Sequence, residues 1–327
     1  MGGAVSGWPT GGGSDVPVVP MSAATTAGGR VLVAGAYSVD LVFQGLAGPV
    51  AYGTEVWAEG FSMVPGGAYT LAMGLRRLGR DVVWAADFGN DAFSEAVLAA
   101  ARDEDLDERG FRHHPRPQRN VTVALSHPGD RAMVSYGDPV VARPLAELID
   151  TYRPTVVMLP FLQYGPEVSD ALDLAARSGA EVFMDCQDFA GSVDMPEVAK
   201  VLGQVGVFAP NAAEALRVTG AGSVDDAIEV LAGLVPTVVI KQDSKGAVAA
   251  EHGVRVVQPS VPVEVVDTTG AGDCFNIGFV HSRLAGGTLA ECLAAGVACG
   301  AASVTTAGSG GALDAAGLRQ WLARLTA

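Results

Sequence analysis

The chain has 327 residues, of which 49% are hydrophobic and 17% charged, and its formal net charge is −15. This composition is typical of a well-filled α/β core, and it excludes a largely disordered chain. The negative charge argues against nucleic acid or an anionic membrane as the main partner, and no apolar run reaches the roughly 18 residues that span a bilayer.

The predicted domain follows a stretch rich in small and polar residues. Residues 1–28 have little to bury and lack the features of a secretory signal, so we expect a disordered tail and one domain over 29–327. The apolar run 31–35 predicts a buried strand that ends in glycine. Asp40 follows five residues later, where α/β sheets bind ligands; a turn or a helix cap is the alternative role.

The next segment breaks the pattern of an α/β unit. Residues 43–64 mix β-forming residues with Gly and Pro, which predicts strands of a small separate sheet. Gly66 and Gly67 follow and let the backbone approach a ligand closely. Apolar residues at helical spacing over 71–78 then predict a helix.

A second candidate for the small sheet is 111–136. Its last part has two strand-like runs around a Pro-Gly-Asp turn, which predicts a hairpin. Its first part, 112–119, is the one basic cluster of an acidic chain. Two interpretations stay open for that cluster: a solvated connection, or an edge that binds an anion.

From residue 145 on, helices and strands alternate, which predicts a doubly wound, mostly parallel sheet. The expected strands are 155–159, 181–185, 205–208 and 237–240, and the expected helices between the first three are 167–178 and 195–202.

Polar residues follow the last two of these strands. Asn211 and Glu214 are three residues apart and share one face at a helix start, where an ordinary helix cap is the alternative reading. Lys241, Asp243 and Gly246 leave the strand 237–240 in a polar turn.

The most informative stretch begins with a β-branched run, 263–266, that predicts a strand end. Gly270, Ala271 and Gly272 then lie before a segment with the period of a buried helix. Unpaired amides and the positive end of the helix dipole make such a turn a site for an anion. Asp273 opens the helix, and a carboxylate beside an anion site suits a base that takes a proton from an attacking hydroxyl.

Residues 267–275, Asp-Thr-Thr-Gly-Ala-Gly-Asp-Cys-Phe, resemble the C-terminal signature of the ribokinase-like (PfkB) sugar kinases. The stretches around Asp40, Gly66 and Asn211 resemble other motifs of that family. The resemblance covers roughly 30–327. It implies a ribokinase-like α/β fold with a small β-sheet lid over the sugar, and ATP-dependent phosphorylation of a primary hydroxyl of a free sugar.

The resemblance also implies a role for each matching residue. The catalytic residues would be Asp273 as base, with Gly270, Ala271 and Gly272 stabilising the phosphoryl oxygens. Asp40, Gly66, Gly67 and Thr70 would bind the acceptor, and Asn211, Lys241, Asp243, Gly246 and Gly272 would bind ATP. Asn211 and Glu214 would hold Mg²⁺ through water, and Asp267 with Ser303, Thr306 and Gly308 would bind a monovalent cation such as K⁺.

Several positions depart from the family pattern, among them Ser38 and Pro65, and three further departures bear on activity. Thr70 and Val297 stand where the family often has Asn, and Asp243 stands where it usually has Gly. These departures motivate one alternative from another class, a sugar- or nucleotide-binding regulator without catalysis. A small-residue helix pair, 289–298 and 300–305, is expected beside the adenine.

The identity of the acceptor stays open. A nucleoside kinase of the same fold is the second alternative, with Tyr37, Phe43 or Tyr69 as candidates for an apolar slot around a base. An uncharged acceptor is expected because residues 31–75 contain no Lys or Arg. A homodimer through the lid and a cytoplasmic protein with reduced, buried cysteines are further expectations.

Overall fold

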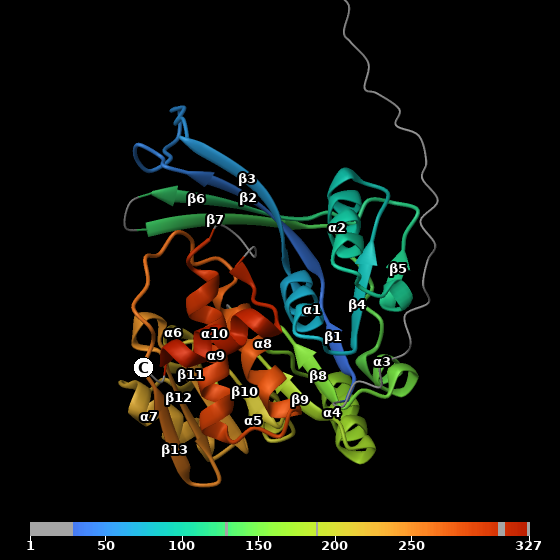
Figure 1. Cartoon of the computed structure of the whole chain (residues 1–327). Helices are drawn as coiled ribbons and strands as arrows, with labels where there is room; N and C mark the ends of the chain where they lie inside the picture. The colour runs from blue at the N-terminus through green and yellow to red at the C-terminus, as the bar shows by residue number, and fades with distance from the viewer. Residues whose placement is uncertain (1–28, 128–129, 188, 307–310, 326–327) are drawn as a thin grey trace, which may run out of the picture.

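Two β-sheets of different size organise the chain (Figure 1). The computed structural model describes residues 29–127, 130–187, 189–306 and 311–325, so the predicted N-terminal tail lies outside the described part. In spatial order, the large sheet contains β13 (Val254–Gln258), β12 (Ala247–Glu251), β11 (Thr237–Lys241), β10 (Val207–Phe208), β9 (Glu181–Met184), β8 (Val156–Leu159), β1 (Val31–Ala34), β4 (Val82–Phe88) and β5 (Phe111–His113).

The large sheet is parallel from β5 to β11, and only β12 and β13 are antiparallel. Both of its faces are covered, so successive residues of a central strand are buried on opposite sides. In β1, Val31 and Val33 belong to one apolar cluster and Leu32 to the other. This arrangement explains the uninterrupted apolar runs in the sequence.

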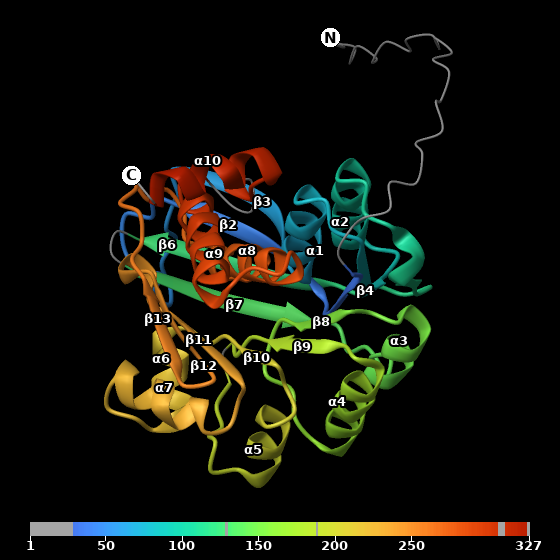
Figure 2. The same ribbon diagram turned by 60° about the horizontal axis from the view of Figure 1, so that its bottom comes forward.

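Helices cover each face (Figures 1 and 2). The first cluster includes residues of α1 (Ala68–Arg77), α2 (Ala92–Asp103), α8 (Ala271–Leu284), α9 (Leu289–Ser303) and α10 (Ala315–Leu325). The second includes residues of α3 (Leu145–Tyr152), α4 (Pro166–Ser178), α5 (Pro196–Leu202), α6 (Ala212–Thr219) and α7 (Val224–Ala232). The predicted doubly wound, mostly parallel sheet is confirmed.

The small sheet stands off the large one (Figure 1). Its strands, in order, are β3 (Gly60–Gly67), β2 (Tyr37–Gln44), β6 (Asn120–His127) and β7 (Asp130–Gly137). β2 is antiparallel to β3 and parallel to β6, and β6 and β7 form the predicted hairpin. Because β3 runs directly into α1, the sheet is joined to the helix layer at its base.

The sequence-based expectations were wrong at several boundaries. Residues 111–113 form β5 of the large sheet, so only the later part of 111–136 belongs to the small sheet, and 45–59 contains no strand. The run 263–266 is not a strand; its residues 264–266 are exposed, and Val266 donates one backbone hydrogen bond to the Val304 carbonyl. The expected helix pair is one helix, α9.

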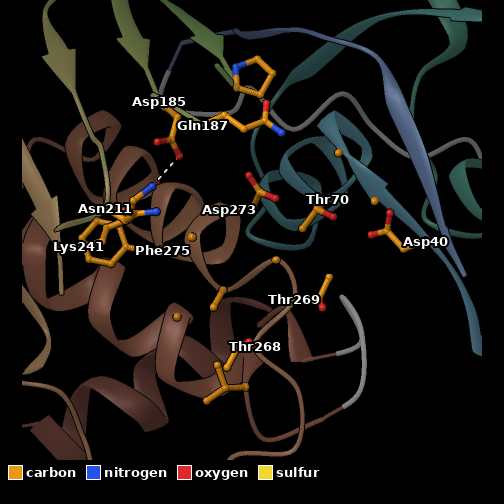
Figure 3. Close-up of a pocket in the computed structure, with 18 of the residues that line it drawn as sticks. Asp40, Thr70, Asp185, Gln187, Asn211, Lys241, Thr268, Thr269, Asp273 and Phe275 are labelled. Atoms are coloured by element: carbon orange, nitrogen blue, oxygen red, sulfur yellow. Dashed lines mark hydrogen bonds and ion pairs between the residues drawn. The ribbon is translucent and has the colours of Figure 1, made fainter. Parts of the chain in front are cut away.

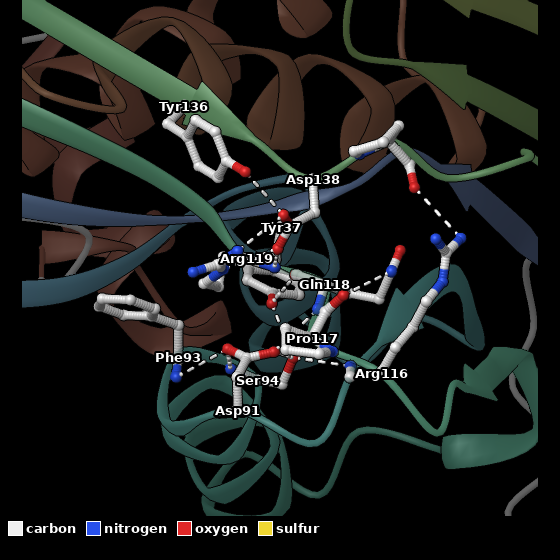
Figure 4. A network of polar contacts seen from close by, with 12 residues as sticks. Tyr37, Asp91, Phe93, Ser94, Arg116, Pro117, Gln118, Arg119, Tyr136 and Asp138 are labelled. Carbon is white, nitrogen blue, oxygen red and sulfur yellow. Dashed lines mark hydrogen bonds and ion pairs between the residues drawn. The ribbon is translucent and has the colours of Figure 1, made fainter.

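A polar network fixes the base of the small sheet against α2 (Figure 4). The Tyr37 hydroxyl donates to the Gln118 carbonyl at 2.5 Å and shares a hydrogen bond of 2.8 Å with Ser94. Asp91 caps α2 and accepts from the Gln118 amide at 2.9 Å. Arg119 pairs with Asp138 on the outside, so the entry to β6 is tied to the exit from β7.

Candidate active site

A cleft of about 1040 Å³ lies between the small sheet and the carboxyl ends of the parallel strands. Its lining contains most of the residues that the sequence singles out, shown in part in Figure 3: Asp40, Gly66, Gly67, Thr70, Asn211, Glu214, Lys241, Asp243, Gly246, Gly270, Ala271, Gly272 and Asp273. The N-terminal ends of α1 and α8 both reach the cleft, since Ala68 and Ala271 line it. The topology therefore unites motifs separated by more than 200 positions.

The turn predicted to bind an anion is the first turn of α8. Gly270 precedes the helix with φ 73°, a left-handed conformation that favours glycine. The amides of this first turn have no partner within the helix, and the dipole adds positive potential. A methyl group added at Gly272 would lie 3.5 Å from Nζ of Lys241, so the ammonium group of Lys241 lies against this turn.

Asp273 lies in the same turn and lines the cleft (Figure 3). Desolvation raises the pKa of its carboxyl group to about 7, and the negative charges of Asp185 and then Asp40 act in the same direction. The positive charge of Lys241 opposes them. A carboxyl group with a pKa near neutral pH suits a proton acceptor, because it is basic enough and about half of it is ionised at that pH.

Asp185 and Asn276 are polar residues that the sequence analysis did not single out. Asp185 directly follows β9, and its carboxylate forms an ion pair of 2.6 Å with Lys241 (Figure 3). Asn276, which lies in α8, donates to the same carboxylate at a distance of 2.5 Å. The position of Asp185 after a buried strand is the signal that selected Asp40, so it could have been found; nothing in the sequence marks Asn276.

The residues predicted to bind the acceptor lie around Asp40 in the wall of the cleft. This residue is inside β2, where Ser38 donates to its carboxylate at 3.0 Å, so the alternative role in a turn or a helix cap is wrong. A methyl group at Gly66 would lie 2.6 Å from the Asp40 carboxylate. Gly67 has φ 62°, and Thr70 is buried in the adjoining turn of α1.

The polar turn after β11 forms another part of the wall. Asp243 has φ 49°, a backbone conformation in which glycine is the usual residue. Gly246 has φ 91°, and a methyl group there would lie 2.0 Å from the Gln258 carbonyl. Only glycine therefore fits at position 246. At position 243, Asp243 adopts a backbone conformation that is strained for a residue with a side chain.

Asn211 and Glu214 form a capping box at the start of α6. The Asn211 side chain accepts from the Glu214 amide at 2.9 Å, and the Glu214 carboxylate accepts from the Asn211 amide at 2.8 Å. Burial raises the pKa of Glu214. The two residues therefore cap α6, as the alternative interpretation has it. Both residues also line the cleft.

The residues expected around a monovalent cation only partly come together. The amide of Asp267 donates to Val304, next to Ser303 at the end of α9, and the Asp267 carboxylate accepts from the Thr269 amide at 2.9 Å. Thr306 lines a separate, smaller pocket, and Gly308 lies outside the described residues. In the described part of the chain, no group of three or more His, Cys, Asp or Glu side chains could hold a metal ion.

Of the aromatic residues expected around a base, only Tyr37 is among those that line the cleft, and it is 1% exposed. Tyr37 and Tyr69 are buried in the core, and the Phe43 ring packs on Phe61 in the small sheet. Phe161 and Met133 are large apolar residues that line the cleft and are partly exposed.

The basic cluster does not reach the cleft. Arg112 pairs with Asp87, Arg119 pairs with Asp138, and Arg116 donates to the Pro139 carbonyl. Among the described lining residues, Lys241 is the one Lys or Arg side chain. The interpretation of the cluster as a connecting segment is therefore favoured over an anion-binding edge.

The fold and the cleft together define a ribokinase-like α/β protein, and comparison with known proteins agrees. The model of the pfkB family of carbohydrate kinases matches residues 31–316, so the chain belongs to this family. Across the residues described, no helix has both the length and the apolar character of a membrane span.

Curated relatives include kinases for different acceptors. The cytidine kinase of Thermococcus kodakarensis is 37% identical over 101 residues, which are 30% of this chain and 36% of that protein. The ribokinase of Arabidopsis thaliana is 29% identical over 39% of this chain and 36% of its own length. The chain thus matches about a third of the length of these two relatives. The ribokinase of Haemophilus influenzae is 24% identical over 73% of this chain and 80% of that protein.

Solved structures show the same fold. The Arabidopsis thaliana ribokinase complexed with ribose and ATP superimposes with a TM-score of 0.73 at 21% identity, covering 91% of this chain and 99% of that one. The nucleoside kinase of Methanocaldococcus jannaschii gives a TM-score of 0.71 at 17% identity, covering 90% and 98%. The expected ribokinase-like fold is confirmed.

Proposed function

We propose that this protein transfers the γ-phosphoryl group of ATP to a primary hydroxyl of a free sugar. The observation that carries the proposal is the position of Asp273: its carboxyl group, with a pKa of about 7, lies in the anion-binding turn of α8 and close enough to Asp40 for the two charges to interact. One cleft thus combines a carboxyl group that suits a base, a helix start that suits an anion and a carboxylate that suits sugar hydroxyls.

Each residue has a defined part in the reaction. Asp40 accepts hydrogen bonds from hydroxyls of the sugar and orients it, and Asp273 takes the proton of the attacking hydroxyl. The bond from that oxygen to phosphorus forms as the bond from phosphorus to the leaving ADP oxygen breaks. The amides of residues 270–272 and the ammonium group of Lys241 stabilise the negative charge on the transferred group.

The donor set around the nucleotide end fits Mg²⁺. Asn211 and Glu214 offer amide and carboxylate oxygens at the wall of the cleft, the ligand chemistry that Mg²⁺ prefers. They would hold the ion through water, and its charge would offset that of the ATP phosphates. The monovalent cation beside Asp267 and Ser303 stays a prediction.

We expect the acceptor to be uncharged. Asp40 would repel a second anion, and the described lining of the cleft offers only Lys241 as a fixed cation, which is already paired with Asp185. Turnover of free pentoses, hexoses and nucleosides should therefore exceed turnover of their monophosphates at saturating MgATP. Exclusive use of a phosphorylated sugar, with a KM that rises sharply in Arg116→Ala or Arg119→Ala, would overturn this expectation.

A nucleoside is the second candidate acceptor, and one observation favours it. Phe161 is 39% exposed and lines the cleft together with Met133 of β7, so a planar base has an apolar wall available. Asn120 and Thr122 of β6 provide polar groups beside that wall. If the acceptor is a nucleoside, Phe161→Ala should raise its KM about tenfold and leave the KM of a free pentose nearly unchanged.

The small sheet is proposed to act as a lid. Asp40, Thr122 and Ser135 project into the cleft from three of its strands, so a bound sugar would order the sheet. Adding the acceptor should slow hydrogen exchange in 37–67 and 120–137, while β11 stays unchanged as an internal control. If the rate of hydrogen exchange in each of the two segments is the same with and without acceptor, the small sheet does not close as a lid.

A homodimer through the outer face of the small sheet is proposed as well. Phe61, Met63, Val134 and Tyr136 alternate with the cleft-facing residues and are exposed, which makes one apolar face on this sheet. We expect a second copy to cover it. Val134→Asp should convert the dimer to a monomer in light scattering, whereas Val230→Asp, an equivalent change on α7, should not; a wild-type monomer at micromolar concentration would contradict the proposal.

A further inference from the structure

One ion pair lies in the wall of the cleft. Among the ion pairs of the described residues, only that of Lys241 and Asp185 has both partners in the lining. Asp185 is 7% exposed, and its carboxylate lies 2.6 Å from Nζ of Lys241. Asn276, which is 1% exposed, donates to that carboxylate at 2.5 Å, and its Oδ1 lies 3.5 Å from the same ammonium group.

Such an arrangement contributes little to stability by itself. Removing two charges from water costs about as much free energy as their attraction returns, so a buried ion pair is weak evidence for a stabilising role. The three side chains come from the end of β9, the end of β11 and the second turn of α8. Their common point is the ammonium group of Lys241, which lies against Gly272 in the anion-binding turn.

We propose that Asp185 and Asn276 are positioning residues that hold the ammonium group of Lys241 over the anion-binding turn, where the transferred phosphoryl group binds. This inference rests on the proposed kinase function. Lysine has a flexible stem with many rotamers, so an ammonium group without fixed partners is spread over a larger volume. Two partners on rigid elements keep the charge in the position where negative charge develops.

Asp185 has a second effect, on the base. The charged groups that face Asp273 are Asp40 from β2, Asp185 after β9 and Lys241 at the end of β11. A lysine beside a base weakens it, because a positive charge favours the ionised carboxylate and lowers its pKa. The negative charge of Asp185 offsets this, so Lys241 stabilises the phosphoryl group while Asp273 keeps its affinity for a proton.

The test uses the pH dependence of kcat/KM for the acceptor, which rises as the base ionises. Asp185→Asn should move this rise to lower pH by about one unit, and Lys241→Met should move it to higher pH by a similar amount. The double variant should return close to the wild-type midpoint. A merely structural role for the pair would lower activity without shifts of opposite sign.

Asn276→Ala separates the positioning effect from the charge effect. It removes the donor to Asp185 without removing a charge, so we expect a KM for MgATP that is raised about tenfold and a pH midpoint close to that of the wild type. Glu104→Gln is the matched control: Glu104 forms a similarly short ion pair with Arg77, outside the described lining of the cleft. That variant should leave both KM and midpoint at wild-type values.

The inference fails if Asp185→Asn and Lys241→Met leave the midpoint unchanged, or move it in the same direction. If Asp185→Asn does not fold, as judged by circular dichroism, the pH midpoint of Lys241→Met and the KM of Asn276→Ala still test the inference. Failure of the kinase function itself is a separate result, seen as a wild type that transfers no phosphoryl group. Binding of a non-hydrolysable ATP analogue, measured by calorimetry, then still tests the positioning, because Asn276→Ala must weaken it.

Discussion

Asp273→Asn should lower kcat for phosphoryl transfer by about 10²–10⁴-fold, the range for loss of a general base. The substitution keeps the shape of the side chain and leaves the amides of residues 270–272 in place. Nucleotide affinity, measured by calorimetry with ADP, should therefore stay within a few-fold of wild type. A variant that keeps more than about a tenth of wild-type turnover would show that Asp273 is not the base.

The same variant should be more stable than the wild type at alkaline pH. The pKa of Asp273 is raised from 3.8 to about 7 in the folded protein, chiefly by desolvation, so the fold favours the protonated form. The wild type thus loses stability as the pH rises from about 4 through 7, by up to about 4 kcal/mol. Asparagine does not ionise, so its unfolding free energy should exceed that of the wild type at pH above about 8 and equal it near pH 4.

Thermal unfolding at the two pH values measures this difference. Asp91→Asn is a control of opposite sign: burial disfavours its charge, but hydrogen bonds from Gln118, Ser94 and Phe93 lower its pKa overall. Neutralising Asp91 should therefore destabilise the protein most at high pH, where the native carboxylate is fully ionised. If the effect of Asp273→Asn on the unfolding free energy does not change with pH, the folded protein does not raise the pKa of the Asp273 carboxyl group.

The sequence predicted the fold and the glycine-rich turn that opens α8 because both depend on local patterns. Alternating apolar runs and helices define the large sheet, and the residues 270–273 are contiguous. The wrong expectations arose where packing overrides local pattern. Gly300 suggests a helix break, yet α9 continues through it and packs there against the first turn of α8, where the Ala271 carbonyl lies.

The parts of the site that were missed depend on long-range contacts. Asp185 lies 56 positions from Lys241 and 91 from Asn276, so their common hydrogen-bond network follows only from the sheet order. The run 263–266 has the residues of a strand but is largely exposed, and it lacks a ladder with any neighbour in the described chain. Phe161 likewise enters the cleft from a loop, a position that no periodic pattern marks.

The most direct test of the account is ³¹P nuclear magnetic resonance of the wild-type protein with MgATP and, in separate samples, free sugars and nucleosides. We predict that at least one uncharged acceptor gives a new phosphomonoester signal together with an equal amount of ADP, and that Asp273→Asn gives neither. If ATP binds but no acceptor in the panel yields a phosphomonoester, the chain is a binding protein on a kinase fold and the central claim is wrong.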